Sequence, residues 1–193
     1  MSEHKYGMVP SDLRQLLGRL NVDDDGRIAF EGERYAFILQ KLLVNALFIE
    51  ALSVLGVSLK TLIRPFSVLV GGSLARHLID KLGVPPENVL EDYAKFNSIR
   101  GWGGIEVVEV DLDAPKVIVR MRNSAFARGV REAVSNVKEV FPFYDCPWGC
   151  TFAGVLKVAL EKTGRQVPEL PYEEVKCETI GNECCEWHVR REN

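Results

Sequence analysis

Residues 171–189 have the sequence Pro-Tyr-Glu-Glu-Val-Lys-Cys-Glu-Thr-Ile-Gly-Asn-Glu-Cys-Cys-Glu-Trp-His-Val. Within this stretch Cys177 and Cys185 are eight residues apart, and Gly181 lies midway between them. Two short strands joined by a glycine-containing turn bring residues at such a spacing opposite each other. The stretch therefore predicts a C-terminal β-hairpin whose two thiols face each other, which is typical of a site for a soft metal ion.

All five cysteines of the chain lie in its last 48 residues, with Cys146 and Cys150 upstream of the hairpin. Buried thiols that act as small apolar side chains are the alternative explanation. The clustering of the cysteines and the nearby carboxylate of Glu174 favour a metal site, because zinc accepts both thiolate and carboxylate ligands. In a cytoplasmic protein, clustered cysteines are also more typical of metal ligands or redox groups than of disulfides.

The overall composition is that of an ordinary globular protein, with 47% hydrophobic and 26% charged residues. A net charge of −3 and the lack of a basic patch disfavour direct binding to nucleic acid. The N-terminus has no apolar signal core, and the most apolar run, residues 35–55, contains Gln40, Lys41, Asn45 and Glu50 and is too polar to span a bilayer. We therefore expect a cytoplasmic protein that does not enter a membrane.

The N-terminal half of the chain predicts mostly helices. A short strand is expected at 27–30, and helices are expected at 13–20, 32–55, 59–63, 68–82 and 85–96. The segment 32–55 is apolar on most of its circumference, which is typical of a helix that is central in a core or shared between two subunits. We therefore expect a homodimer, with Ala36, Leu43 and Leu47 as candidates for the shared seam.

The C-terminal half predicts strands paired in hairpins. One hairpin is expected from residues 105–112 and 116–122, helices at 130–137 and 152–162, and a last hairpin from 173–179 and 184–190. Helices followed by such strand pairs indicate an α+β fold, with helices packed on an antiparallel sheet. Residues 1–27 are expected to form an N-terminal extension, and residues 28–193 the main domain.

Four short patterns together resemble the 4-vinyl-reductase domain family. They are Gly101-Trp102-Gly103, Arg122-Asn123-Ser124, Cys150-x3-Gly154, and the terminal set of Glu174, Cys177, Gly181, Cys185 and Trp187. The family includes the small-molecule-binding module of aromatic-sensing bacterial transcription activators, a bacteriochlorophyll biosynthesis protein and stand-alone archaeal proteins. Its fold is related to that of subunits of the TRAPP vesicle-tethering complex. The resemblance covers about residues 28–189 and implies a TRAPP-like fold.

The resemblance implies one structural zinc ion that clips the C-terminal hairpin to a helix. Carried over residue by residue, its ligands fall on Cys150, Glu174, Cys177 and Cys185. The chain departs from the family pattern in that Cys184 stands directly beside Cys185, and Cys146 lies four residues before Cys150. Cys146, Cys184 and His188 therefore remain open as alternative ligands. Glu174 and Cys177 are an odd number of residues apart, so both can bind one ion only at a bulge or a strand end.

The resemblance also implies an apolar cavity between the helices and the sheet. Trp102, Phe126, Tyr144 and Trp148 are the candidates to line it. The expected ligand is a small uncharged aromatic or hydrocarbon molecule, because no anion-binding loop is evident in the sequence. We expect a sensor or carrier whose output passes through a regulatory protein partner or through delivery of the ligand, since no ATPase or DNA-binding motif is present.

Two further functions remain as alternatives. One is an enzyme or enzyme accessory, associated with a reductase in tetrapyrrole-like metabolism, although no catalytic residue set is recognised in the sequence. The other is a protein-interaction scaffold like the vesicle-tethering subunits, in which side chains of the protein would fill the cavity.

Overall fold

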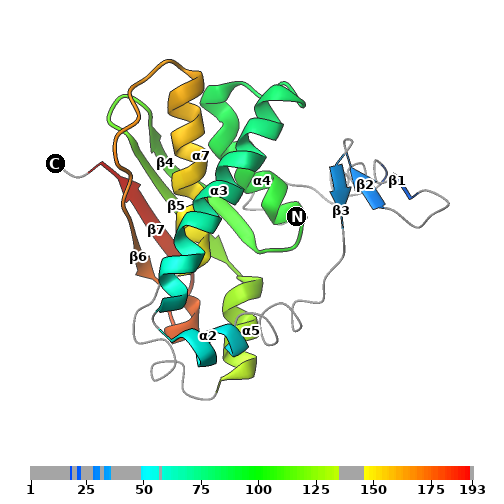
Figure 1. Ribbon diagram of the computed structural model, residues 1–193, viewed down its shortest axis with the longest axis vertical. Coiled ribbons are helices and arrows are strands. Elements are labelled where there is room, and N and C mark those ends of the chain that lie inside the picture. The colour runs from blue at the N-terminus through cyan, green and yellow to red at the C-terminus, as the bar shows by residue number, and fades with distance from the viewer. Residues whose placement is uncertain are drawn as a thin grey trace, which may run out of the picture. The chain divides into compact units, whose positions relative to one another are not determined.

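The chain divides into two compact units, residues 1–39 and residues 40–193. The computed structural model describes residue 18 and the ranges 21–22, 28–30, 33–35, 49–56, 58–134 and 146–191 (Figure 1). The helix expected at 13–20 lies outside these residues except for residue 18, which is in a turn. The domain boundary expected after residue 27 stays a prediction.

The first unit contains a three-stranded antiparallel sheet rather than the start of a long helix. Its strands are β1 (Asn21–Val22), β2 (Ile28–Phe30) and β3 (Glu33–Tyr35), in the order β1-β2-β3. Phe30 pairs with Glu33, and glycine is one of the two residues between them in the sequence, which favours a hairpin connection. The helix predicted from residue 32 is therefore wrong over β3, whereas the strand predicted at 27–30 is confirmed.

The end of the same predicted helix is confirmed as α2 (Glu50–Leu55). The seam candidates Ala36, Leu43 and Leu47 lie outside the described residues. The two helices predicted at 59–63 and 68–82 are one continuous helix, α3 (Ser58–Asp80), with Pro65 inside it. A proline removes one helical hydrogen bond and usually breaks or kinks a helix, but tertiary packing against a neighbouring helix outweighs that cost here.

That neighbouring helix is α7 (Pro147–Lys162), and the two helices approach each other at paired glycines. A Cβ atom added at Gly71 would overlap the carbonyl oxygen of Thr151, and one added at Gly154 would overlap the carbonyl oxygen of Val68. Only glycine permits this separation of the two backbones. The helix predicted at 152–162 is confirmed, but it begins five residues earlier, at Pro147, a residue type favoured in the first turn of a helix.

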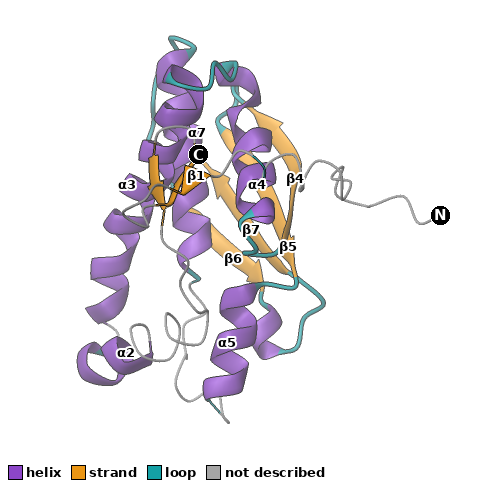
Figure 2. Ribbon diagram, turned by 90° about the vertical axis from the view of Figure 1, so that its right-hand side faces the viewer, coloured by secondary structure: helices purple, strands orange, loops and turns teal. Residues whose placement is uncertain are grey.

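A four-stranded antiparallel sheet forms the other layer of the second unit. Its strands are β4 (Gly104–Asp111), β5 (Lys116–Arg122), β6 (Tyr172–Lys176) and β7 (Cys185–Arg190), in the order β4-β5-β7-β6. Both predicted hairpin strand pairs are confirmed as strands, and the central register pairs Val119 with Trp187. Figures 1 and 2 show α3, α4 and α7 on one side of this sheet, with α7 in contact with it. The predicted α+β class is confirmed.

Two further helices complete the second unit. Helix α4 (Val89–Ile99), preceded by the 3-10 turn Pro86–Asn88, confirms the helix predicted at 85–96. Helix α5 (Ala125–Ala133) lies beyond one end of the sheet (Figure 2) and replaces the helix predicted at 130–137. It starts earlier because the Ser124 hydroxyl accepts a hydrogen bond from the Ala127 N–H at 3.2 Å, and it ends at Val134, which is extended.

The described helices include none with both the length and the apolar character needed to cross a membrane.

The close approach of α3 and α7 makes a specific prediction about Gly71. We expect Gly71→Ala to lower the free energy of unfolding by about 3 kcal/mol, because the new methyl group forces the two helices apart. The matched control is Gly72→Ala, where a Cβ would meet its nearest atom at 3.5 Å, an ordinary contact. Urea unfolding followed by circular dichroism measures both. Equal stability of the two variants would contradict the predicted helix contact.

Candidate ligand cavity and metal site

A cavity of about 400 Å³ lies among α2, α3, α4, α5 and α7, all in the second unit. Most of its lining is apolar: Ala51, Leu59, Ile63, Phe66, Val70, Leu74, Trp102, Phe126, Pro147 and Trp148. The polar lining residues are Ser67, Tyr93, Asn97, Arg100 and Thr151. A volume of this size with few polar groups is typical of a site for a small organic molecule.

Trp102 is positioned by the loop between α4 and β4. Its indole ring meets that of Trp148 edge to face, with ring centroids 5.2 Å apart. The loop is held because the Trp102 carbonyl accepts a hydrogen bond from the Ala125 N–H at 2.8 Å. Gly103 follows with a φ of 147°, a conformation that side-chain-bearing residues rarely adopt. The Gly-Trp-Gly pattern thus places a large ring at the cavity wall.

Three of the four ring residues predicted for the cavity, Trp102, Phe126 and Trp148, do line it. The fourth, Tyr144, lies outside the described residues. The sequence did not identify Phe66 or the polar residues of α4 as lining the cavity. Phe66 lies in the middle of α3, where the sequence predicted a gap between two helices. A spacing of four and three residues among Tyr93, Asn97 and Arg100 places them on one helix face, a pattern visible in the sequence but not informative without the cavity.

The polar lining residues are joined by hydrogen bonds on the α4 side of the cavity. The Asn97 side-chain amide donates to the Tyr93 carbonyl at 2.9 Å, and Arg100 Nη1 donates to Asn97 Oδ1 at 3.3 Å. The Thr151 hydroxyl donates to the Trp148 carbonyl at 2.8 Å. Burial raises the pKa of Tyr93 to about 12, so its hydroxyl stays protonated at neutral pH.

The metal-site residues come together at the C-terminal hairpin. Glu174, Cys177 and Cys185 each place a ligand atom within 4.8 Å of the others, so the three residues could hold a metal ion. The register between β6 and β7 shifts between Glu174 and Lys176, and this irregularity lets Glu174 and Cys177 face the same site. The turn closes at Gly181, which has a φ of 98°.

A hydrogen bond couples the two thiols. It lowers the pKa of Cys177 to about 6, and it raises the pKa of Cys185. The Thr179 hydroxyl lies 2.8 Å from Cys177 Sγ, and the Glu178 N–H donates to Cys185 Sγ at 3.3 Å. Two cysteine side chains and a carboxylate gathered in a largely buried place make a donor set that fits zinc.

The remaining candidate ligands have different surroundings. Among the described residues, neither Cys150 nor Cys146 belongs to the group of three. Both are buried at the start of α7, and the Cys146 N–H donates to Glu174 Oε2 at 2.9 Å, which orients that carboxylate.

The two alternatives on the hairpin, Cys184 and His188, have charged side chains in their surroundings. Burial raises the pKa of Cys184, and the charges of Lys176 and Arg120 oppose that shift. His188 Nε2 lies 3.2 Å from Glu186 Oε1. Successive residues of a strand face opposite sides, which separates Cys184 and Glu186 from Cys185.

Glu178 connects the metal-site hairpin to the cavity. Its side chain is only 6% exposed, and its two carboxylate oxygens accept hydrogen bonds from the N–H groups of Asn123 at 2.7 Å and Ser124 at 3.0 Å. Asn123 has a φ of 54°, and Ser124 caps α5, which carries the cavity residue Phe126. A carboxylate from the hairpin thus holds the start of a helix that forms part of the cavity wall.

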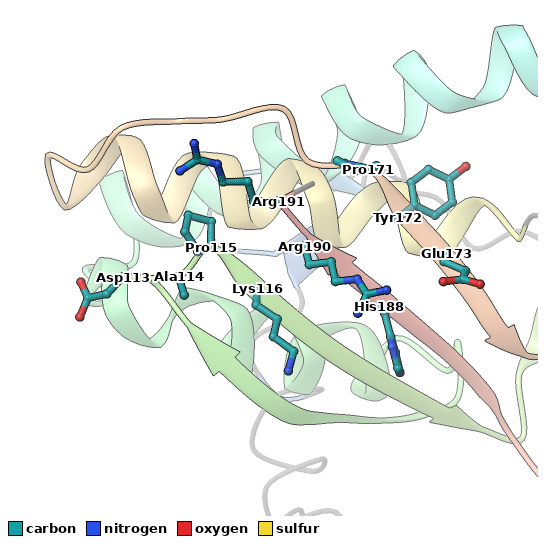
Figure 3. Close-up of a pocket in the computed structure, with 10 residues that line it drawn as sticks. All are labelled: Asp113, Ala114, Pro115, Lys116, Pro171, Tyr172, Glu173, His188, Arg190 and Arg191. Carbon is teal, nitrogen blue, oxygen red and sulfur yellow. The ribbon is translucent and has the colours of Figure 1, made fainter. Parts of the chain in front are cut away.

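A second, larger hollow lies at the other end of the sheet and has a different character. It measures about 1080 Å³, and Figure 3 labels its lining: Asp113, Ala114, Pro115, Lys116, Pro171, Tyr172, Glu173, His188, Arg190 and Arg191. Charges of both signs line it, and Lys116 is paired with Glu109 at 2.8 Å. Polar and charged side chains make most of the lining of this groove, whereas the lining of the cavity beside Trp102 is mostly apolar, so that cavity is the better candidate for a small organic molecule.

Comparisons with known proteins show the fold. No protein-family profile matches the sequence, and no curated protein sequence is detectably similar. The structure is similar to that of the phenol-responsive sensory domain of the transcription activator PoxR with phenol, at 17% identity and a TM-score of 0.65, covering 96% of this chain and 90% of that one. It is also similar to a trafficking protein particle complex subunit 3 from Naegleria fowleri covalently bound to palmitic acid, at 16% identity and a TM-score of 0.53, covering 80% of this chain and 95% of that one. The fold is therefore α+β, and a subunit of the trafficking protein particle complex is among the solved structures that it resembles.

The link through Glu178 predicts a loss of stability in Glu178→Gln. An amide retains only one acceptor oxygen for two buried N–H donors, so we expect the free energy of unfolding to fall by about 2 kcal/mol. Glu183→Gln is the matched control, because Glu183 lies in the same hairpin turn and is exposed. Thermal unfolding measures both variants. If Glu183→Gln is as damaging as Glu178→Gln, the assigned role of Glu178 is wrong.

Proposed function

We propose that this protein binds a small, mainly apolar molecule, aromatic or hydrocarbon, and acts as a sensor or carrier in the cytoplasm. The observation that carries the proposal is the cavity of about 400 Å³ lined by Trp102, Trp148, Phe126 and other apolar side chains. Burial of apolar ligand surface there contributes about 25 cal/mol per Å² before the costs of ordering. A scaffold protein would be expected to fill this space with its own side chains.

The fold supports the same proposal. PoxR uses it for a domain described as phenol-responsive, and the Naegleria fowleri subunit is described with bound palmitic acid. One of these ligands is aromatic and the other is a long aliphatic chain, so the fold accommodates apolar molecules of both kinds. For this chain, the rings around Trp102 favour an aromatic body.

The proposal predicts that Trp102→Ala weakens ligand binding. We expect 1-naphthol, used as an aromatic probe, to bind at least tenfold more weakly to the variant, because the ring that packs against Trp148 is lost. Isothermal titration calorimetry measures the affinity, and Trp102→Phe, which keeps an aromatic ring, is expected to retain most of it. Unchanged affinity in Trp102→Ala would show that the probe does not bind in this cavity.

We further propose that the hairpin holds one structural zinc ion. Glu174, Cys177 and Cys185 supply three ligands, and Cys150 at the start of α7 is the proposed fourth. Zinc would cross-link the hairpin to helix α7 through its ligands. The residues of the chain orient the site: the Cys146 N–H holds the Glu174 carboxylate, and the Glu178 N–H donates to Cys185 Sγ.

This zinc proposal predicts about one zinc per chain in protein purified without chelator. We expect Cys177→Ser to lose the metal and to unfold at a lower temperature, whereas Cys184→Ser keeps the metal, because Cys184 is outside the group of Glu174, Cys177 and Cys185. Acid should release the metal, since protonation of the thiolates competes with binding. Native mass spectrometry and metal analysis measure the content. Metal loss in Cys184→Ser but not in Cys177→Ser would overturn the ligand assignment.

A homodimer and a regulatory protein partner belong to the same proposal. Leu62, Phe66 and Leu69 on α3 are 61%, 64% and 66% exposed, and such an apolar stripe is typical of a surface that another chain covers. The native mass spectra also report the subunit count. A flavin or nicotinamide found at one equivalent per chain would instead favour the enzyme alternative.

A further inference from the structure

We propose that Ser67 binds the ligand of the cavity through a hydrogen bond, and that this ligand is an apolar molecule with one hydroxyl group. The inference rests on the proposed function and deepens it. It names the polar group that the ligand carries and the side chain that recognises that group, and it separates the ligand from a pure hydrocarbon.

Ser67 interrupts an apolar face of helix α3. The other residues of α3 that line the cavity follow helical spacing and are all apolar: Leu59, Ile63, Phe66, Val70 and Leu74. Ser67 lies in the middle of this face and is only 5% exposed. Burial of a hydroxyl group without a hydrogen bond costs free energy, so a serine at this position needs an explanation.

The Ser67 hydroxyl has no hydrogen-bond partner among the residues that the structure describes. A serine in a helix commonly donates to a carbonyl of the preceding turn, as Ser98 does to the Ala94 carbonyl at 2.9 Å. Ser67 makes no such bond. Its oxygen is also not among the polar atoms that the packing seals from open space, and the residue lines the cavity. The hydroxyl is therefore available to a molecule inside the cavity.

The other polar side chains described in the lining already have partners in the protein. The Tyr93 hydroxyl has side-chain hydrogen bonds with Thr151 and Asn97, and Arg100 Nη1 donates to Asn97 Oδ1 at 3.3 Å. The Thr151 hydroxyl in turn donates to a carbonyl of its own helix at 2.8 Å. These groups make a satisfied wall, which leaves Ser67 as the polar contact for the ligand.

Close packing of the helices explains a small residue at position 67 but not a hydroxyl group. Helix α3 meets α7 at Val68 and Gly71, directly after Ser67. Alanine is equally small, has a higher helix propensity than serine and carries no polar atom. Ligand recognition therefore explains Ser67 better than helix packing does.

A hydroxyl group on the ligand matches Ser67 because a serine hydroxyl both donates and accepts hydrogen bonds. Water that enters a cavity hydrogen-bonds to such a group. A hydrocarbon that displaces this water leaves the Ser67 hydroxyl unsatisfied, whereas an apolar alcohol or phenol replaces the lost hydrogen bond. Ser67 is neutral, so the matching group on the ligand is neutral as well.

The test compares 1-naphthol and 2-naphthol with 1-methylnaphthalene and 2-methylnaphthalene, in which a methyl group of similar size replaces the hydroxyl. Isothermal titration calorimetry measures the affinities. We expect Ser67→Ala to weaken binding of the better naphthol isomer about tenfold, the loss of roughly one good hydrogen bond. Binding of the methylnaphthalenes should be unchanged or tighter.

Ser73→Ala is the matched control for this comparison. Ser73 is an exposed serine on the same helix and does not line the cavity. We expect it to bind all four probes as the wild-type protein does. A loss of naphthol affinity in Ser73→Ala equal to that in Ser67→Ala would overturn the assignment of the hydrogen bond to Ser67.

Thermal unfolding of the ligand-free protein tests the premise that the hydroxyl is free. Ser67→Ala should not lower the unfolding temperature, because it removes no hydrogen bond within the protein and introduces a better helix former. A clear fall in the unfolding temperature would show that the protein itself uses this hydroxyl, and the inference would then be wrong.

The binding outcomes separate this inference from the proposed function. Unchanged naphthol affinity in Ser67→Ala would overturn the hydroxyl assignment and leave the apolar cavity function standing. Equal weakening of naphthols and methylnaphthalenes would also overturn it, because the loss would then come from a change in cavity shape. Failure of all four probes to bind the wild-type protein would overturn the proposed function together with this inference.

Discussion

The close contact between α3 and α7 is the constraint on which the second unit depends. Gly71 and Gly154 let the two helix backbones approach more closely than any side chain would allow. Helix α7 then contacts the sheet as well, so one helix joins both layers of the domain. Its first turns supply Trp148 and Thr151 to the cavity and Cys146 and Cys150 to the region of the hairpin. A shift of α7 would therefore disturb the cavity and the metal site together.

The cavity and the metal site are separate in space but share their supports. Glu178, next to the ligand candidate Cys177, holds the N-terminal end of α5, and the Cys146 N–H from the start of α7 holds the Glu174 carboxylate. Both links are hydrogen bonds to carboxylates, which are stronger than bonds between neutral groups. A metal bound at the hairpin would therefore make the cavity wall more rigid and reduce the ordering cost of ligand binding.

The chemistry of the cavity follows from the side chains that line it. Apolar rings from four separate segments line the site: Phe66 from α3, Trp102 from the loop before β4, Phe126 from α5 and Trp148 from α7. The groove at the other end of the sheet has a different character, because its lining includes charged side chains of both signs. The apolar lining of the cavity is therefore the feature that suits it to a small organic molecule.

The sequence by itself determined the features that depend on local spacing. Alternation of apolar and polar residues predicted the strands of the first hairpin, and the turn at Gly181 predicted the last hairpin. The spacing of Cys177 and Cys185 around Gly181 predicted two thiols at one site. The odd spacing of Glu174 and Cys177 predicted the irregularity that the structure has between Glu174 and Lys176. Tertiary structure decided whatever depends on distant partners. Pro65 lies inside a continuous helix because α7 supports it, residues 33–35 pair with β2 instead of starting a helix, and α5 begins at the Ser124 cap. Arg100 belongs to the cavity only because the packing of α3 and α7 against α4 encloses a space there, and residues far apart in the sequence carry no local pattern that reports such an enclosure.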